Sequence, residues 1–210
     1  PDLLLRAYAA GIFPMAETRN TGRVFWVDPK HRGILPLEKF HVPRRLRRTV
    51  RNGPFEITCN IDFSEVVAMC AEYSEERTDT WINPAIEAAV NELNKMGFAH
   101  SIECRLQGKL VGGLYGISIG AAFFGESMFS RVRDSSKVAL VHLVARLKLG
   151  GFRLLDTQFM TDHLSQFGAI EIPARDYLDL LRDALKHQAT FPTLINSKRW
   201  LETLNYINTK

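Results

Sequence analysis

Two short segments of this sequence place polar side chains that could do chemistry inside apolar surroundings. Glu126 lies within the run FGESMF (residues 124–129), and Asp156 and Gln158 directly follow the apolar run FRLL (152–155). A carboxylate among apolar neighbours must be paired, hydrogen-bonded or protonated. The end of a buried strand is also where α/β sheets tend to place working groups. Each segment is therefore a candidate catalytic site, and the alternative for each is a structural polar contact.

A third segment is strongly basic. Guanidinium groups present a planar, permanently charged fork that matches phosphate oxygens, so a cluster of arginines is a candidate contact for phosphate or nucleic acid. The net charge of +4 and the sequence pI near 9.1 also favour an anionic partner. The alternative is a solvated basic turn. The cluster consists of Arg44, Arg45, Arg47, Arg48 and Arg51.

A group of large apolar side chains is interpreted as core or, alternatively, as the lining of a side-chain pocket. Methionine adapts to ligands of variable shape, which keeps the second interpretation open. Trp81 stands just before a predicted helix cap, where an indole can stack on a nucleobase or cover the core. The apolar group consists of Leu114, Phe123, Phe124, Met128, Phe129, Leu140, Leu147 and Leu155.

Other common chemistries find no support in the sequence. Cys59, Cys70 and Cys104 are an odd number of thiols, far apart and without a C-x-x-C pair, so neither a disulfide framework nor a zinc site is predicted. The histidines show no triad order with a serine or cysteine. The glycines between residues 112 and 125 lie in predicted strands and open no helix, which argues against a nucleotide-binding fold.

Hydrophobic periodicity and turn residues predict a chain of alternating helices and strands. We expect an α/β (α+β) fold in which a mostly antiparallel sheet carries helices on both faces, as in acetyltransferase-like proteins. Helices are predicted over 3–8, after Asp62, over 84–96, over 134–149, before Gly168 and over 176–186; strands over 55–58, 98–106, 109–117, 121–124, 152–155 and 169–172; residues 11–36 are predicted to be loop.

The composition sets the overall organisation. A chain of 210 residues with 46% hydrophobic and 24% charged residues can bury a substantial core. We expect a small N-terminal region over 1–36, a catalytic domain over 37–187 and a C-terminal tail over 188–210. No apolar run reaches the length of a membrane span and the first residues do not resemble a secretory signal, so a cytoplasmic location is predicted.

Six ordered segments of the chain resemble the bacterial leucyl/phenylalanyl-tRNA-protein transferase family. The resemblance runs from about Leu3 to Leu185. The segments are GIFP (11–14), TWI (80–82), GFAHSIE (97–103), LVGGLYG (110–116), GESMFS (125–130) and DTQ (156–158).

The resemblance implies an enzyme that transfers leucine or phenylalanine, and less readily methionine, from aminoacyl-tRNA to an N-terminal arginine or lysine of a protein, which marks that protein for degradation. It implies a fold like that of the peptidoglycan-bridge aminoacyl transferases. No metal or other cofactor is expected, because an aminoacyl ester is already activated. A monomer without membrane contact is expected.

The resemblance also implies roles for individual residues. Asp156 and Gln158 match the pair credited with catalysis, and Glu126 matches an acidic residue of the same site. Trp81 matches a tryptophan that contacts the terminal adenosine of tRNA, and Met15 stands where many members have a second tryptophan. The implied side-chain pocket is formed by Leu114, Phe123, Met128, Leu140, Leu147 and Leu155, and the arginine cluster is implied to bind the tRNA acceptor stem.

The chemistry of the reaction suggests how the acidic residues act. We expect Gln158, oriented by Asp156, to accept a hydrogen bond from the attacking amine, and Asp156 and Glu126 to attract a cationic N-terminus. Two alternative functions are compatible with the sequence. An acyl-CoA N-acyltransferase would share the sheet order, although residues 131–137 lack the glycine-rich pyrophosphate turn of that class. A tRNA-binding module without activity is the other, since Met15 weakens adenosine stacking.

Overall fold

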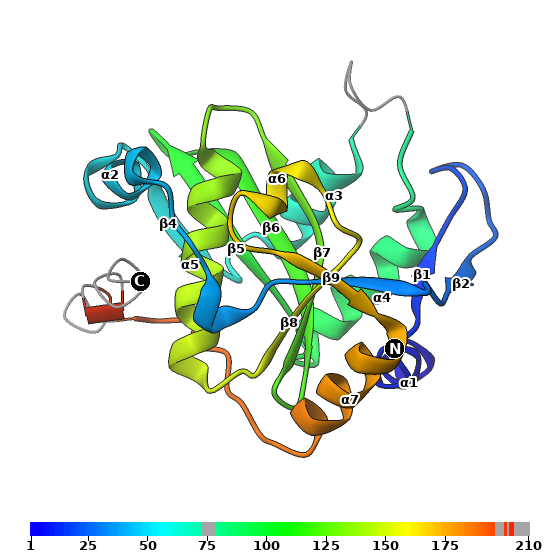
Figure 1. The fold of residues 1–210 in the computed structure, drawn as a ribbon. Helices are drawn as coiled ribbons and strands as arrows, with labels where there is room; N and C mark the ends of the chain where they lie inside the picture. The colour runs from blue at the N-terminus through cyan, green and yellow to red at the C-terminus, as the bar shows by residue number, and fades with distance from the viewer. Residues whose placement is uncertain (73–78, 196–199, 201, 204–210) are drawn as a thin grey trace.

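The computed structural model describes residues 1–72, 79–195, 200 and 202–203, which form a mixed α/β fold around one large sheet (Figure 1). Within these residues the helices are α1 (Asp2–Ala9), α2 (Arg44–Asn52), α3 (Phe63–Ala71), α4 (Pro84–Lys95), α5 (Ser135–Gly150), α6 (Asp162–Ser165) and α7 (Ala174–Leu185), with a 3-10 turn η1 (Leu37–Lys39). The strands are β1 (Phe13–Met15), β2 (Phe25–Val27), β3 (His31–Ile34), β4 (Glu56–Cys59), β5 (Ala99–Leu106), β6 (Lys109–Ile119), β7 (Ala122–Ser130), β8 (Leu154–Gln158) and β9 (Ile170–Pro173).

The main sheet has seven strands in the order β4-β5-β6-β7-β8-β3-β9. All neighbours pair antiparallel except β7 and β8, which pair parallel. The prediction of a mostly antiparallel sheet is confirmed. The parallel pairing covers only 122–124 against 154–156, and beyond Phe124 and Asp156 the two strands no longer pair. The sheet therefore opens between β7 and β8.

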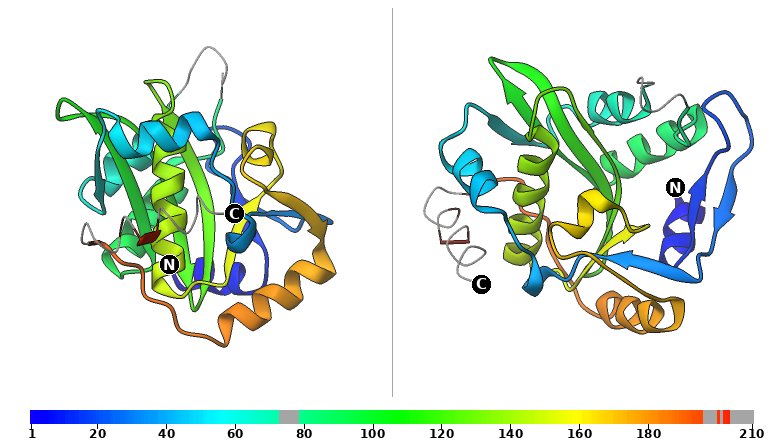
Figure 2. Two further views of the ribbon diagram at one scale, coloured as in Figure 1. Left: turned by 60° about the vertical axis from the view of Figure 1, so that its left-hand side comes forward. Right: turned by 45° about the horizontal axis from the view of Figure 1, so that its top comes forward.

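Helices cover both faces of this sheet, as the apolar pattern predicted. In the right-hand view of Figure 2, α5 lies on one face while α3 and α4 lie on the other. Val141 and Val144 of α5 are fully buried on the first face, and Val66 and Val67 of α3 on the second. Burying each such side chain stabilises the folded state by roughly 1.5–3 kcal/mol. The two helical layers therefore hold β7 and β8 in place on either side of the opening.

Several predicted helices and strands are confirmed, and local turn and cap residues set where they begin and end. Asn83 caps α4, because its side-chain oxygen accepts a hydrogen bond from the backbone nitrogen of Ile86 at 2.9 Å. Gln107 and Gly108 both have positive φ, at 52° and 75°, which is the geometry that joins β5 and β6 with the correct twist. Gly151 ends α5 with a φ of 80°.

The prediction of a loop over 11–36 is wrong. Strands β1 and β2 form a two-stranded hairpin, and β3 lies inside the main sheet between β8 and β9. Proline and glycine interrupt these three- and four-residue strands, and the partners of β3 lie more than a hundred residues away, so no local pattern marks them. The predicted boundary between the N-terminal region and the catalytic domain at residue 36 stays a prediction. Strand β3, which lies before this boundary, belongs to the main sheet.

The basic segment forms helix α2 and not a turn. Pro43 precedes its first turn, Leu46 anchors it in the core, and Gly53 follows its last residue. Arginine is a good helix former, so the charge run is compatible with a helix exposed on one side.

The predicted tail over 188–210 lies partly outside the described residues. Within it, Phe191 is buried and its ring stacks on that of His100 at 4.2 Å. Among the described residues, no helix combines the length and the apolar composition needed to cross a membrane.

Gly33 of β3 provides a test of how tightly β3 fits against β8. A Cβ atom at this position would lie 2.8 Å from the carbonyl carbon of Phe159 and 2.8 Å from Oγ1 of Thr157. We expect Gly33→Ala to lower the free energy of unfolding by roughly 1–3 kcal/mol, measured by urea denaturation. Gly22→Ala is the matched control, since nothing lies within 4 Å of its Cβ. Equal stability of the two variants would contradict the close packing of β3.

Candidate active site

A cavity of about 480 Å³ lies where β7 and β8 separate, and residues of α5 and α6 contribute to its lining. Its walls are mainly apolar, and polar groups gather on one side. The residues lining it are Trp81, Leu114, Tyr115, Gly125, Glu126, Ser127, Met128, Phe129, Ser130, Ser136, Leu140, Leu143, Leu155, Thr157, Gln158, Phe159, Thr161, His163 and Leu164.

Two irregularities in the strands bring the polar groups to this cavity. Between β6 and β7, Tyr115 pairs with Ser127 and Gly116 with Gly125, so Glu126 is an extra residue on its strand. Between β3 and β8, Gly33 pairs with Gln158 and Ile34 with Asp156, so Thr157 is extra. A β-bulge re-aims side chains and is common beside active sites.

Gln158 bridges the two separated strands. Its side-chain Nε2 donates a hydrogen bond to Oε1 of Glu126 at 2.9 Å. Its backbone has a φ of 61°, a left-handed conformation that is unusual for a residue other than glycine. Such strain persists only where the surroundings enforce it. The bond from Nε2 orients the carboxamide so that its oxygen is the acceptor available to a substrate.

Asp156 enforces that backbone conformation. Its Oδ1 accepts from the backbone nitrogen of Gln158 at 2.7 Å and from Nε of Arg32 at 3.0 Å. Its Oδ2 accepts from Arg32 at 2.6 Å and from the hydroxyl of Tyr177 at 2.6 Å. Asp156 is 0% exposed and does not line the cavity. The expectation that Asp156 attracts a cationic substrate is therefore wrong, because protein donors already occupy both of its oxygens.

Arg32 is itself held on every side. Its guanidinium carbon lies 4.5 Å from the ring centres of both Phe13 and Tyr177, and a further nitrogen donates to the carbonyl of Gly11 at 2.9 Å. The side chain is 1% exposed. Arg32 and Asp156 thus form a buried, fully hydrogen-bonded ion pair that links β3 to β8.

Glu126 is the titratable group of the cavity wall. Its pKa is raised to about 8, chiefly by burial and also by the charge of Asp156, while hydrogen bonds with Tyr8 and Gln158 and the charge of Arg32 act in the opposite direction. Below that pH the carboxyl of the unliganded protein is largely protonated. A cation bound beside it would stabilise the ionised form.

The structure brings most of the residues predicted for the site together. Glu126 and Gln158 line the cavity together with Trp81 and the apolar residues Leu114, Met128, Leu140 and Leu155. Phe123 and Leu147 do not line it, because both are fully buried in the core behind it. Met15 packs against the same core cluster as Trp81, and the neighbouring Ala16 donates a backbone hydrogen bond to the carbonyl of Trp81 at 3.1 Å.

Several residues of the site could not be predicted from the sequence. Arg32 stands in a segment predicted to be loop, and Tyr8 and Tyr177 belong to helices whose apolar faces predict core only. Tyr115 lies in a strand and gives no signal beyond its β propensity. Among apolar residues, Leu143 and Phe159 line the cavity without having been predicted.

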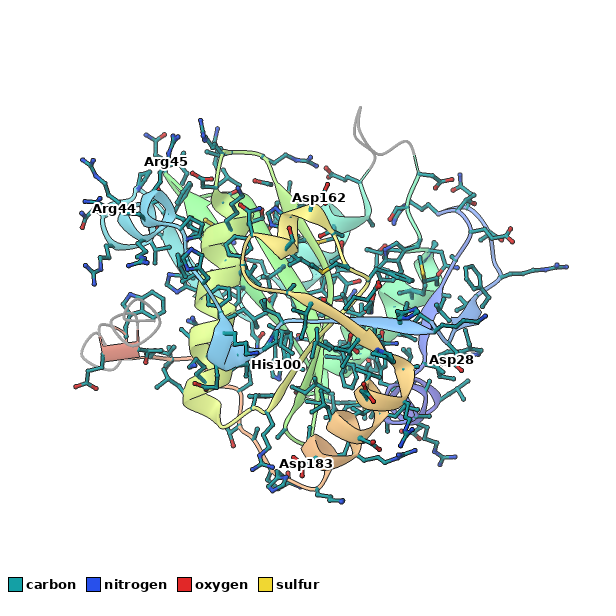
Figure 3. All side chains as sticks on the ribbon, in the orientation of Figure 1. Asp28, Arg44, Arg45, His100, Asp162 and Asp183 are labelled. Carbon is teal, nitrogen blue, oxygen red and sulfur yellow. The ribbon has the colours of Figure 1, made fainter. Side chains whose placement is uncertain are left out.

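The arginine cluster lies outside the cavity, on α2, which packs against α5. Figure 3 shows Arg44 and Arg45 at the edge of the molecule, on the same upper side as Asp162 of α6. Arg44, Arg45, Arg48 and Arg51 are exposed, whereas Arg47 is partly buried and its Nε donates to the carbonyl of Val42 at 2.9 Å. The exposed members form a positively charged face next to the helix that lines the cavity.

Comparison with known proteins gives consistent matches. The family described as "Leucyl/phenylalanyl-tRNA protein transferase" matches residues 34–182, and its N-terminal domain matches residues 1–30. The leucyl/phenylalanyl-tRNA–protein transferase of Paramagnetospirillum magneticum is 60% identical over 190 residues, covering 90% of this chain and 91% of that protein. The protein of the same name from Phenylobacterium zucineum is 61% identical over 191 residues, covering 91% and 86%.

A solved structure of FemX shares the fold. It superimposes with a TM-score of 0.53 at 11% sequence identity, covering 82% of this chain and 66% of that one. At this identity the likeness concerns the fold alone, and it confirms the predicted sheet architecture.

The ion pair of Arg32 and Asp156 can be tested by a double-mutant cycle. Removing one partner leaves a buried charge without compensation, so we expect Arg32→Met and Asp156→Asn each to lower the free energy of unfolding by about 3–5 kcal/mol. The double variant should lose clearly less free energy of unfolding than the two single variants lose together. The control is Arg182→Met, which removes an exposed ion pair with Asp179 and should cost at most about 1 kcal/mol. Additive losses in urea denaturation would contradict direct coupling.

Proposed function

The chain belongs to the leucyl/phenylalanyl-tRNA protein transferase family, and on that premise we propose that its cavity is where an aminoacyl ester of tRNA transfers its amino acid to a protein. The activity is that of an aminoacyltransferase, with aminoacyl-tRNA and protein as the substrate classes. We infer that it acts as a cytoplasmic monomer on acceptors that begin with arginine or lysine, and that the transfer marks them for N-end-rule degradation.

The observation that carries the proposal for the site is an apolar cavity with Gln158 and Glu126 on one wall. The lining residues Leu114, Met128, Leu140 and Leu155 fit an unbranched-at-Cβ apolar side chain such as that of leucine or phenylalanine. An apolar pocket discriminates by roughly 1–3 kcal/mol for each methylene group. A polar side chain would lose its hydration there without gaining hydrogen bonds.

The reaction needs positioning more than activation. The amine nitrogen of the acceptor forms a bond to the ester carbonyl carbon, the bond from that carbon to the ribose oxygen breaks, and the proton lost by the amine goes to the leaving oxygen directly or through water. Holding the two reactants at near-attack distance can contribute roughly 7–11 kcal/mol at most. No external energy source is required, because an ester is converted to a more stable amide.

Gln158 is the proposed partner of the attacking amine. A neutral carboxamide is too weak a base to take the proton, but its oxygen can accept a hydrogen bond from the amine and so aim the nitrogen lone pair at the ester. The bonds from Gln158 to Asp156 and Glu126 hold that oxygen in place. Asp156 is therefore a positioning residue in this proposal.

The remaining tRNA contacts are assigned by their position. Trp81 lines the cavity and is proposed to contact the terminal adenine, with Met15 close by in place of a second indole. The exposed arginines of α2 are proposed to bind phosphates of the acceptor stem, because α2 packs on α5 and α5 lines the cavity.

Transfer of labelled leucine and phenylalanine from charged tRNA tests the activity directly. We expect transfer to a peptide beginning with arginine and none to one beginning with aspartate. Gln158→Ala should lower kcat by roughly 10²-fold, since loss of alignment alone has effects of that size, while tRNA affinity is unchanged. Gln188→Ala, an exposed glutamine, is the control. Binding of tRNA without transfer by the unaltered protein would instead indicate a tRNA-binding module.

The arginine cluster is tested by the salt dependence of tRNA binding. Neutralising Arg44, Arg45 or Arg48 by alanine should each weaken binding and reduce the slope of log Kd against log salt concentration by roughly 0.7–0.9 for each lost phosphate contact. The rate at saturating tRNA should not change. Arg175→Ala, an exposed arginine of α7, serves as a control on the opposite side of the molecule. An unchanged slope in all three α2 variants would refute the assignment.

A further inference from the structure

Trp81, the proposed contact for the terminal adenine, lies in a segment without regular secondary structure. Residues 79–83 come directly before α4 and belong to neither a helix nor a strand. The hydrogen bonds of a sheet or a helix therefore do not hold the backbone here, and its polar groups need other partners. The contacts that these residues make with the rest of the protein decide where the indole lies.

The hairpin loop, residues 16–24 between β1 and β2, lies beside this segment and bonds to it at two backbone positions (Figure 1). The backbone nitrogen of Ala16 donates to the carbonyl of Trp81 at 3.1 Å. The side-chain nitrogen of Asn83, a buried residue, donates to the carbonyl of Thr21 at 2.9 Å. The hairpin loop is therefore a direct support of the segment that carries Trp81.

Arg19 makes three further bonds between the hairpin loop and this region. Its backbone nitrogen donates to Oδ1 of Asp79 at 3.1 Å, Nη1 donates to the carbonyl of Ile82 at 3.0 Å, and Nη2 donates to Oε2 of Glu87 at 3.1 Å. The side chains of Arg19 and Glu87 are 29% and 26% exposed, so solvent screens this ion pair less than a pair on the open surface. The bonds to Asp79 and Ile82 fix the chain on either side of Trp81.

Resting on the function proposed above, we propose that Arg19 is a positioning residue for the terminal adenosine of aminoacyl-tRNA. Arg19 is not among the described residues that line the cavity, so it acts through Trp81. A segment that is already held in its binding conformation loses less conformational freedom when the ligand binds, which raises the affinity. Met15, the residue before Ala16, is a flexible side chain, so a fixed Trp81 has the larger part in holding the base.

A direct contact between Arg19 and a tRNA phosphate is the main alternative. Protein oxygens already accept from both terminal nitrogens of the guanidinium. The carboxylate of Glu87, 3.1 Å away, also offsets the positive charge and repels a phosphate. The geometry therefore favours a role inside the protein, and a donor without phosphates separates the two roles.

The first experiment measures binding of phenylalanyl-adenosine in which an amide replaces the ester, a donor analogue without phosphates. We expect Arg19→Met to raise its Kd by roughly 3- to 10-fold, because the freed segment must be ordered on binding. Arg23→Met is the matched control, since Arg23 is exposed in the same loop and its side chain makes no hydrogen bond or ion pair with the described residues. An unchanged Kd in Arg19→Met would overturn the proposal. No binding by the unaltered protein would refute the proposed function together with this role.

The second experiment separates positioning from a general loss of stability. With phenylalanyl-tRNA as donor, Arg19→Met should raise KM by the same factor and leave kcat unchanged, because only binding is weakened. Glu87→Gln should raise KM less, and the double variant should be no worse than Arg19→Met, since both changes act on one contact. A lower kcat at unchanged KM would overturn the proposal. So would a salt dependence of tRNA binding reduced by roughly 0.7–0.9 in slope, which would indicate a phosphate contact.

The third experiment observes Trp81 without any ligand. The chain has three tryptophans, so Trp26→Phe together with Trp200→Phe leaves Trp81 as the only indole. In this background Arg19→Met should shift the emission to longer wavelength and increase its quenching by acrylamide, because the segment opens more often. Arg23→Met should change neither. A raised Kd with unchanged emission and quenching would show that Arg19 does not act through Trp81 and would overturn the proposal.

Discussion

The buried ion pair between Arg32 and Asp156 is the interaction on which the site depends. Two charges removed from water are stable only when their geometry and remaining hydrogen bonds are nearly complete. Here Asp156 receives Arg32, Tyr177 and the backbone of Gln158, and this network holds Gln158 in its left-handed conformation. The orientation of the proposed amine partner is thus set by a charge pair that does not reach the cavity.

This arrangement makes the N-terminal residues part of the site. Arg32 brings the partner charge on β3, Gly11 and Phe13 hold its guanidinium, and Tyr8 approaches Glu126 from α1. None of these residues lines the cavity. The first 36 residues therefore hold Asp156 and Glu126 in position from outside the cavity.

The cavity between β7 and β8 has an apolar wall and a polar wall. The face toward α5 supplies leucines and Met128, where burial of apolar surface favours an apolar side chain. The opposite side supplies Glu126 and Gln158, which are hydrogen-bonded to each other. Irregular geometry gathers at the same place, in two bulges and one strained backbone. These features lower the stability of the free protein and are expected where a substrate group compensates for them.

Features with local signals can be predicted from the sequence alone: the cap at Asn83, the turn at Gln107 and Gly108, the helix that ends at Gly151, and the buried setting of Glu126 and Asp156. The family can be predicted in the same way, because six short motifs occur in order. Other features are visible only in the folded chain: β3 enters the sheet, Arg32 neutralises Asp156, and Phe123 and Leu147 lie behind the cavity while Leu143 and Phe159 line it. These depend on partners distant in the chain and on one-residue shifts in strand register, which reverse the direction of a side chain without changing the local pattern.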